Sequence, residues 1–109
     1  RQWSAAPVNA FILWKNEAVS VTAGEGNLGS YSKTPRSIRK WCLTCGGHVL
    51  TEHPGWGLTD VFAAVTPDFP YTPTVHVNYQ ETRLPVADGL PKLRDLPEKM
   101  GGSGITMAE

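Results

Sequence analysis

Two cysteines, Cys42 and Cys45, are the residues whose type and spacing point most directly to chemistry. They stand in Cys42-Leu43-Thr44-Cys45-Gly46-Gly47, where two intervening residues allow one tight turn to aim both sulfurs at a single tetrahedral metal ion. Glycine after the second cysteine frees the backbone to curl around the sulfurs. We therefore expect both cysteines to be metal ligands in a knuckle. Zinc is the expected metal, because tetrahedral cysteine sites commonly hold it.

Other uses of the cysteine pair stay open at this point: a redox pair, a disulfide, or two unrelated thiols. A thioredoxin-type redox pair lies at the start of a helix, whose N-terminus stabilises the thiolate. Here Gly46-Gly47 is followed by the β-prone run Val49-Leu50-Thr51, so no helix is expected to begin. Two cysteines in 109 residues make no disulfide scaffold, which favours a reducing, cytoplasmic setting.

A structural zinc ion needs four ligands, and the two cysteines supply only half of them. His48, His53 and His76 are possible completions, although a lone histidine is more often a surface residue or a satisfied core residue. We expect instead that two further cysteines lie in a segment upstream of residue 1. The reason is that residues 1–7 run straight into an apolar strand and do not look like a polar terminus.

A glycine string, Gly24-x-Gly26-x-x-Gly29, matches the dinucleotide-binding fingerprint as letters. That fingerprint needs a helix that opens within it, so that the helix N-terminus can hold a pyrophosphate. The residues that follow end at Pro35 and cannot form this helix, so we expect a hairpin turn instead. Neither a Gly-x-Ser-x-Gly nor a His-Glu-x-x-His motif occurs in the chain.

The elements that must position the cysteines are short strands. Eleven glycines and nine prolines exclude a helical bundle and favour strands joined by turns. Three prolines make residues 67–73 irregular, and at most a helical turn is expected near 86–90. The prediction is an all-β domain of about six to eight strands. The expected strands are residues 7–14, 18–22, 28–32, 37–41, 48–51, 58–65 and 75–79.

One domain is expected over residues 1–98, followed by a glycine-rich flexible tail over 99–109. Ten Lys and Arg balance ten Asp and Glu, which argues against a nucleic-acid partner. No apolar run approaches the ~18 residues that a membrane span requires. The charge balance leaves protein partners possible, and the sequence leaves the oligomeric state undefined.

The order of these features resembles the glutathione-dependent formaldehyde-activating enzyme family, which also includes centromere protein V. The family pattern is an arginine, a variable residue, an aromatic residue and then Cys-x-x-Cys-Gly. It is matched here by Arg39, Trp41, Cys42, Cys45 and Gly46. The similarity spans residues 3–93, with a later Val-His-Val at 75–77 and Leu-Pro at 90–91.

The resemblance implies an all-β "tent" fold with two zinc sites. A structural zinc would be held by a Cys-x-Cys from the N-terminal part and by the later pair, which Cys42 and Cys45 match. A catalytic zinc would be held by a cysteine cluster that precedes the point where this sequence starts, so no catalytic residue is carried over. The implied activity is that of a carbon–sulfur lyase joining a small thiol such as glutathione to formaldehyde. The centromere relative supplies the alternative, a non-catalytic zinc-stabilised binding module.

Overall fold

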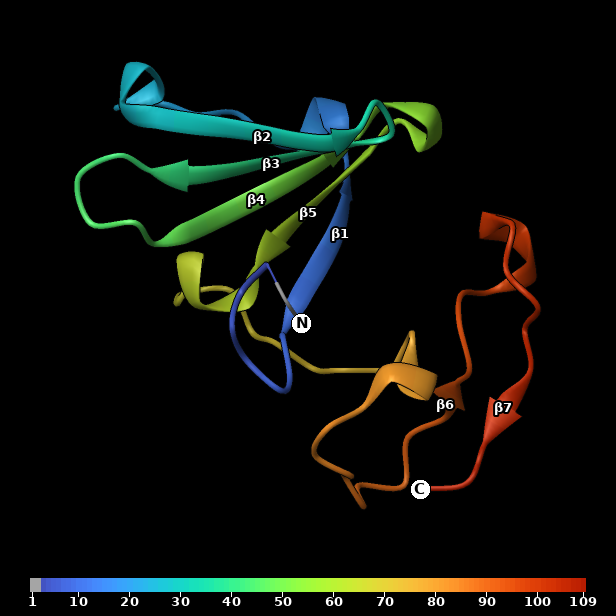
Figure 1. Ribbon diagram of the computed structural model, residues 1–109. Helices are drawn as coiled ribbons and strands as arrows, with labels where there is room; N and C mark the ends of the chain where they lie inside the picture. Colours follow the sequence, from blue (N-terminus) through green and yellow to red (C-terminus); the bar gives the residue numbers. More distant parts are fainter. Residues whose placement is uncertain (1–2) are drawn as a thin grey trace. The chain divides into compact units, whose positions relative to one another are not determined.

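The computed structural model describes residues 3–109, which fall into two compact units. One unit is the continuous stretch Ala10–Tyr71, and the other combines residues 3–9 with Thr72–Glu109. Both are drawn in Figure 1. No helix among the described residues has the length and apolar character needed to cross a membrane.

The continuous unit is built on an antiparallel sheet of five strands in the order β1-β5-β4-β3-β2 (Figure 1). Consecutive strands from β2 to β5 are neighbours, and β1 joins the sheet beside β5. Short 3-10 turns lie in the connections from β1 to β2 and from β4 to β5 and directly after β5, whereas tight turns join β2 to β3 and β3 to β4. The strands are β1 Phe11–Lys15, β2 Leu28–Thr34, β3 Ser37–Cys42, β4 His48–His53 and β5 Leu58–Phe62; the turns are η1 Asn16–Ala18, η2 Glu25–Asn27, η3 Pro54–Trp56 and η4 Ala63–Val65.

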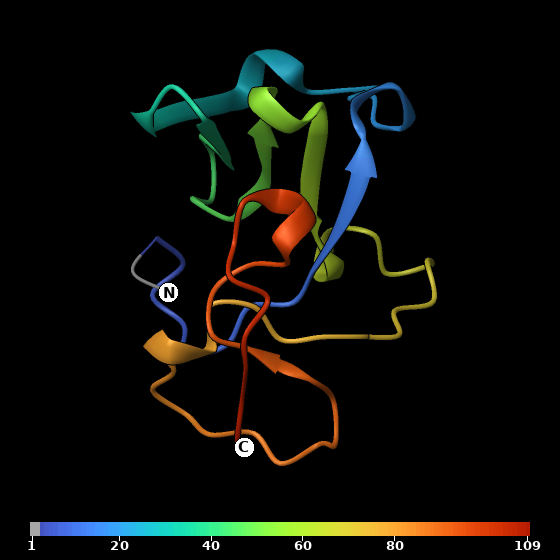
Figure 2. The same cartoon turned by 90° about the vertical axis from the view of Figure 1, so that its right-hand side faces the viewer.

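The core of this unit lies where β4 and β5 pair. Leu50 lies opposite Val61, and Val61 lies opposite Ile12 on β1. Leu50 and Val61 are each only 6% exposed. Because directly opposed residues share one face of a sheet, these three apolar side chains form one row across β1, β5 and β4. Irregular backbone follows η4 over residues 66–71, coloured yellow in Figure 2.

Strand β2 is packed onto β3 through a glycine. Gly29 lies opposite Trp41, and a Cβ atom at Gly29 would come within 2.4 Å of the Trp41 indole ring. The ring therefore occupies the space that any larger residue at position 29 would need. At the same tryptophan the register between β3 and β4 shifts: Lys40 pairs with Leu50, whereas Trp41 pairs with His48. This bulge leaves Val49 without an opposite residue, close to the cysteine turn.

The second unit contains the short antiparallel pair β6 Lys92–Leu93 and β7 Thr106–Met107. His76 forms an isolated parallel bridge to Lys92, and a 3-10 turn, η5 Tyr79–Glu81, follows it. The chain then turns back through η6 Glu98–Met100 to bring β7 alongside β6, in orange to red in Figure 2. Residues 99–109, expected as a flexible tail, thus include part of η6 and all of β7.

The all-β prediction is confirmed, and so are the strands expected at 28–32, 37–41 and 48–51, each of which is longer in the structure. The strand expected at 58–65 ends at Phe62, and the one expected at 7–14 begins at Phe11. The strand predicted at 18–22 is wrong, because no strand forms there. The stretch 75–79 makes one bridge only, and no helical turn forms at 86–90, where at most one was expected. The 3-10 turns η5 and η6, at 79–81 and 98–100, were not predicted.

Candidate metal centre

The two cysteines lie where β3 ends and the chain turns back towards β4. Cys42 is the last residue of β3, and Cys45 lies in the turn itself. The Cys42 N–H donates to the Gly47 carbonyl over 2.8 Å, and the Gly46 N–H donates to the Cys42 carbonyl over 2.8 Å. Gly46 adopts a left-handed backbone with φ of 76°, which glycine reaches without steric cost. The tight turn predicted from the glycines is confirmed.

Backbone N–H groups of this turn are directed at the sulfurs. Hydrogen bonds from the Cys45 and Thr44 backbone, and a contact from the Cys45 thiol, hold the pKa of Cys42 below its ordinary value, although burial opposes them. The Gly47 N–H donates to Cys45 Sγ over 3.4 Å. Both cysteines are free thiols, Cys42 half-buried and Cys45 exposed. Donors at sulfur favour the thiolate, which is the form that binds metal ions.

A side chain from outside the turn also reaches the site. Asn27, the last residue of η2, places its amide Nδ2 3.6 Å from Cys42 Sγ and 2.9 Å from the Thr44 hydroxyl. Its backbone carbonyl accepts the Leu43 N–H over 2.9 Å. Sequence reasoning missed Asn27, because its only sequence signal was membership of a glycine-rich turn. What brings it to the site is the pairing of Leu28 with Cys42 across β2 and β3.

The donor set fits half of a tetrahedral zinc site. One turn brings two sulfurs together, and its N–H groups can remain bonded to them as thiolates, as ligand sulfurs in metal knuckles require. Cys42 and Cys45 are the residues that would hold the metal. Within residues 3–109, no three or more His, Cys, Asp or Glu side chains gather in a way that could hold a metal ion. The described part of the chain thus offers the pair and no larger group.

The three histidines considered as additional ligands have other surroundings. The His48 ring lies 6.1 Å from that of Phe62, measured between centroids. His53 Nε2 lies 2.8 Å from Asp60 Oδ2. His76 bonds to Asp88 in the second unit. The glycine string at 24–29 leads into η2 and strand β2 and not into a helix, so the dinucleotide fingerprint lacks its essential element.

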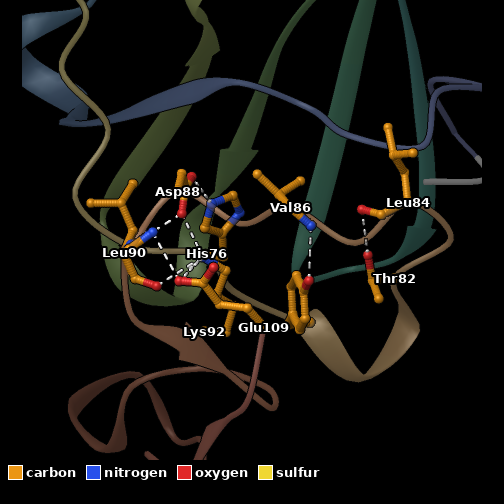
Figure 3. A network of polar contacts seen from close by, with 10 residues as sticks. His76, Thr82, Leu84, Val86, Asp88, Leu90, Lys92 and Glu109 are labelled. Atoms are coloured by element: carbon orange, nitrogen blue, oxygen red, sulfur yellow. Dashed lines mark hydrogen bonds and ion pairs between the residues drawn. The ribbon is translucent and has the colours of Figure 1, made fainter.

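A second polar cluster surrounds Lys92 (Figure 3). The Lys92 side chain is 1% exposed; its ammonium group pairs with Asp88 and, over 3.4 Å, with Glu109. It also donates to the Leu90 carbonyl over 2.9 Å. Asp88 Oδ2 lies 2.7 Å from His76 Nε2. Lys92 foremost, and His76 after it, hold the pKa of Asp88 far below its ordinary value. The cluster ties three chain segments together, which assigns it a structural role.

No family model, curated protein or solved structure matches this chain. The strongest candidate among the described residues is the Cys42–Cys45 turn, where the Gly47 N–H donates to Cys45 Sγ and backbone hydrogen bonds from Cys45 and Thr44 lower the pKa of Cys42.

Proposed function

We propose that the Cys42–Cys45 turn is a zinc knuckle, and that the chain is a zinc-binding β domain of the glutathione-dependent formaldehyde-activating type. The observation that carries the proposal is the tight turn that holds both cysteines, in which the Gly47 N–H donates to Cys45 Sγ over 3.4 Å and hydrogen bonds from the turn lower the pKa of Cys42. A turn that serves only to reverse the chain has no need to point its donors at side-chain sulfur. Donors placed in this way stabilise thiolates before any metal arrives.

Zinc bound to the pair would supply a tetrahedral centre that neutralises thiolate charge and cross-links the turn. The chain's own residues prepare for it. Gly46 permits the left-handed backbone that closes the turn, and the Cys42 N–H fixes the far side of the turn on Gly47. The exposure of Cys45 leaves one side of the pair open to further ligands. Metal binding at such a site is coupled to folding, so its loss destabilises the domain.

The activity proposed for a protein that carries this domain is that of a carbon–sulfur lyase acting on small thiol adducts in the cytoplasm. In the synthetic direction the sulfur of a thiol such as glutathione bonds to the carbon of formaldehyde, and the thiol proton passes to the carbonyl oxygen. What supports this is the resemblance at Arg39, Trp41, Cys42, Cys45 and Gly46. The cysteine cluster that would perform the reaction is not among the residues carried over, so no catalytic role is assigned within this chain.

A non-catalytic, zinc-stabilised binding module is the second candidate. It is favoured by the apolar side chains that the continuous unit exposes after β5: Val65, Phe69 and Tyr71 are each between 41% and 44% exposed. The balanced charge of ten basic and ten acidic residues fits a protein partner better than a nucleic acid. In this alternative the knuckle stabilises the sheet and the exposed apolar side chains bind the partner.

Native mass spectrometry of the reduced chain, with zinc supplied in slight excess, tests the knuckle. We expect bound zinc in the wild type and its loss in Cys42→Ser and in Cys45→Ser, while Ser30→Ala on the exposed part of β2 serves as the matched control. Chelation should lower the thermal midpoint of the wild type and leave the thermal midpoints of both cysteine variants unchanged. If either cysteine variant changes the free energy of unfolding by less than ~0.5 kcal/mol, the scale of ordinary surface substitutions, the site is not structural.

The lyase proposal is tested separately, on a protein that joins this domain to the family's upstream cysteine cluster. The rate of S-hydroxymethylglutathione formation from glutathione and formaldehyde should rise above the uncatalysed rate. An unchanged rate in a zinc-loaded protein would remove the lyase and leave the binding module. Zinc binding and catalysis are thus decided by different measurements.

A further inference from the structure

We infer that Asn27 is a positioning residue for the metal site, and that it orients Cys42 as the more firmly held of the two ligands. The inference rests on the proposed zinc knuckle and deepens it. It names a residue outside the Cys-x-x-Cys turn, contributed by a different segment of the sheet. The juxtaposition is that of the Asn27 amide with Cys42 Sγ and the Thr44 hydroxyl.

The Asn27 backbone is held without help from its side chain. Its N–H donates to the Gly24 carbonyl over 2.9 Å, which closes η2. Its carbonyl accepts the Leu43 N–H over 2.9 Å, and the next residue, Leu28, pairs with Cys42. The first residue after Cys42 is therefore hydrogen-bonded directly to Asn27. A substitution that removes only the side chain leaves these backbone bonds in place.

The Asn27 side chain adds two hydrogen bonds, one to Thr44 and one to the Cys42 sulfur. An asparagine amide nitrogen carries two protons, and here one partner is the Thr44 oxygen at 2.9 Å and the other is Cys42 Sγ at 3.6 Å. The bond to Thr44 fixes the plane of the amide, so that its second proton is directed at the sulfur. An amide nitrogen donates and does not compete with the metal for the thiolate, which suits a residue that supports a ligand.

The two sulfurs consequently differ in their support. Cys42 Sγ is approached by the backbone N–H groups of Thr44 and Cys45 and by the Asn27 amide. The backbone support of Cys45 Sγ is the Gly47 N–H at 3.4 Å. Cys42 is also half-buried, whereas Cys45 is exposed. Removing the Asn27 amide should weaken the support of Cys42 Sγ, the better supported ligand, so that the two cysteines become more alike in their hydrogen bonding.

The experiment compares Asn27→Ala with the matched control Asn16→Ala. Asn16 also lies in a 3-10 turn, and its side chain accepts a hydrogen bond from Thr59 over 2.8 Å, so the control loses a comparable bond far from sulfur in the sequence. Zinc affinity is measured by competition with a chromophoric chelator. The sulfur-to-metal charge-transfer band is recorded with Co²⁺ in place of zinc, since that band reports directly on the ligand sulfurs.

We expect Asn27→Ala to bind zinc about 10-fold or more weakly, the usual scale for loss of a group that supports a ligand, and to shift the Co²⁺ band. Asn16→Ala should retain zinc affinity within about twofold and leave the band in place, even if its thermal midpoint falls. Wild-type affinity and an unmoved band in Asn27→Ala would overturn the inference. An equal loss of affinity in Asn16→Ala would overturn it as well, because the effect would then be general destabilisation.

A wild-type chain that binds neither metal would refute the knuckle, and Asn27 is then judged in the metal-free protein. The readout is the pair of Asn27 side-chain amide resonances in a nitrogen–proton correlation spectrum. Cys42→Ala should shift them because a sulfur acceptor is removed, whereas Cys45→Ala should leave them close to their wild-type positions. Resonances unmoved by Cys42→Ala would overturn the positioning role, whatever the fate of the metal site.

Discussion

Replacing Gly29 by alanine tests whether the contact between β2 and β3 determines the geometry of the cysteine turn. The new Cβ would lie 2.4 Å from one carbon of the Trp41 indole and 2.5 and 2.8 Å from two others. Carbon atoms in contact rest about 3.5–4.0 Å apart, so the ring or the strand must retreat by about 1 Å. Overpacking of this kind costs roughly 1–3 kcal/mol. Alanine regains part of this, about 0.5–1 kcal/mol, because glycine is unfavourable within a strand.

The balance predicts that Gly29→Ala is destabilised by roughly 1–2 kcal/mol, which corresponds to a fall in thermal midpoint of about 4 °C or more for a small domain. Trp41 directly precedes Cys42, so zinc affinity should fall as well. Chemical unfolding followed by tryptophan fluorescence gives the free energy. Ser30→Ala, at the next and exposed position of β2, is the control and should change the stability by less than ~0.5 kcal/mol.

A double-mutant cycle decides whether the indole is the cause. In a Trp41→Leu background the obstacle is gone, and Gly29→Ala should become neutral or slightly stabilising. If the alanine costs the same in both backgrounds, the destabilisation has another origin. If it is neutral even beside Trp41, the close packing of Gly29 against the indole is refuted.

Substitutions at three further positions probe the turn and the second unit. Gly46→Ala places a side chain at φ of 76° and should cost roughly 1–2 kcal/mol in urea unfolding; Gly46→Asn should cost less, and equal costs would contradict the role of the left-handed backbone. The low pKa of Asp88 in the folded state means that its contribution to stability is complete above the ordinary pKa of aspartate, near 4, and is lost as the pH falls below it. Asp88→Asn should therefore lower the thermal midpoint at pH 7 and reduce the fall of the midpoint towards acid pH. If the midpoint of the variant falls towards acid pH as steeply as that of the wild type, Asp88 is not the group that causes the fall. Gly102→Ala would bring a Cβ within 2.0 Å of the Leu96 carbonyl oxygen, so faster amide exchange at β6 and β7 is expected, and wild-type protection there would be inconsistent with this packing.

The strands around the cysteine turn could be predicted because their signals are local. A glycine-rich turn precedes residues 28–32 and Pro35 separates them from 37–41, while Tyr31, Ile38 and Trp41 supply β-prone side chains within the two stretches. In the stretch 18–22 apolar and polar residues alternate, yet no strand forms there. Such alternation indicates a half-buried strand surface but does not supply a neighbouring strand to pair with. In the described sheet no strand pairs with this stretch, and Val21 is 39% exposed.

Part of the candidate site could likewise be predicted from the sequence, and part could not. Cys42, Cys45 and Gly46 lie within a few residues of each other, so their turn follows from spacing and from the conformational freedom of glycine. Asn27 comes to Cys42 only through the pairing of Leu28 with Cys42. Register between strands depends on the whole buried pattern and on bulges such as the one at Lys40 and Trp41, neither of which a single sequence shows.

The division into units also has a consequence for the order in which the chain can acquire structure during synthesis. Every strand of the five-stranded sheet comes from one uninterrupted stretch, Ala10–Tyr71, so the sheet and the cysteine turn can form as soon as that stretch is free of the ribosome. The second unit takes residues from both sides of that stretch and needs β7 near the C-terminal end before it can close. A nascent chain can therefore form the cysteine turn while the second unit is still unfolded.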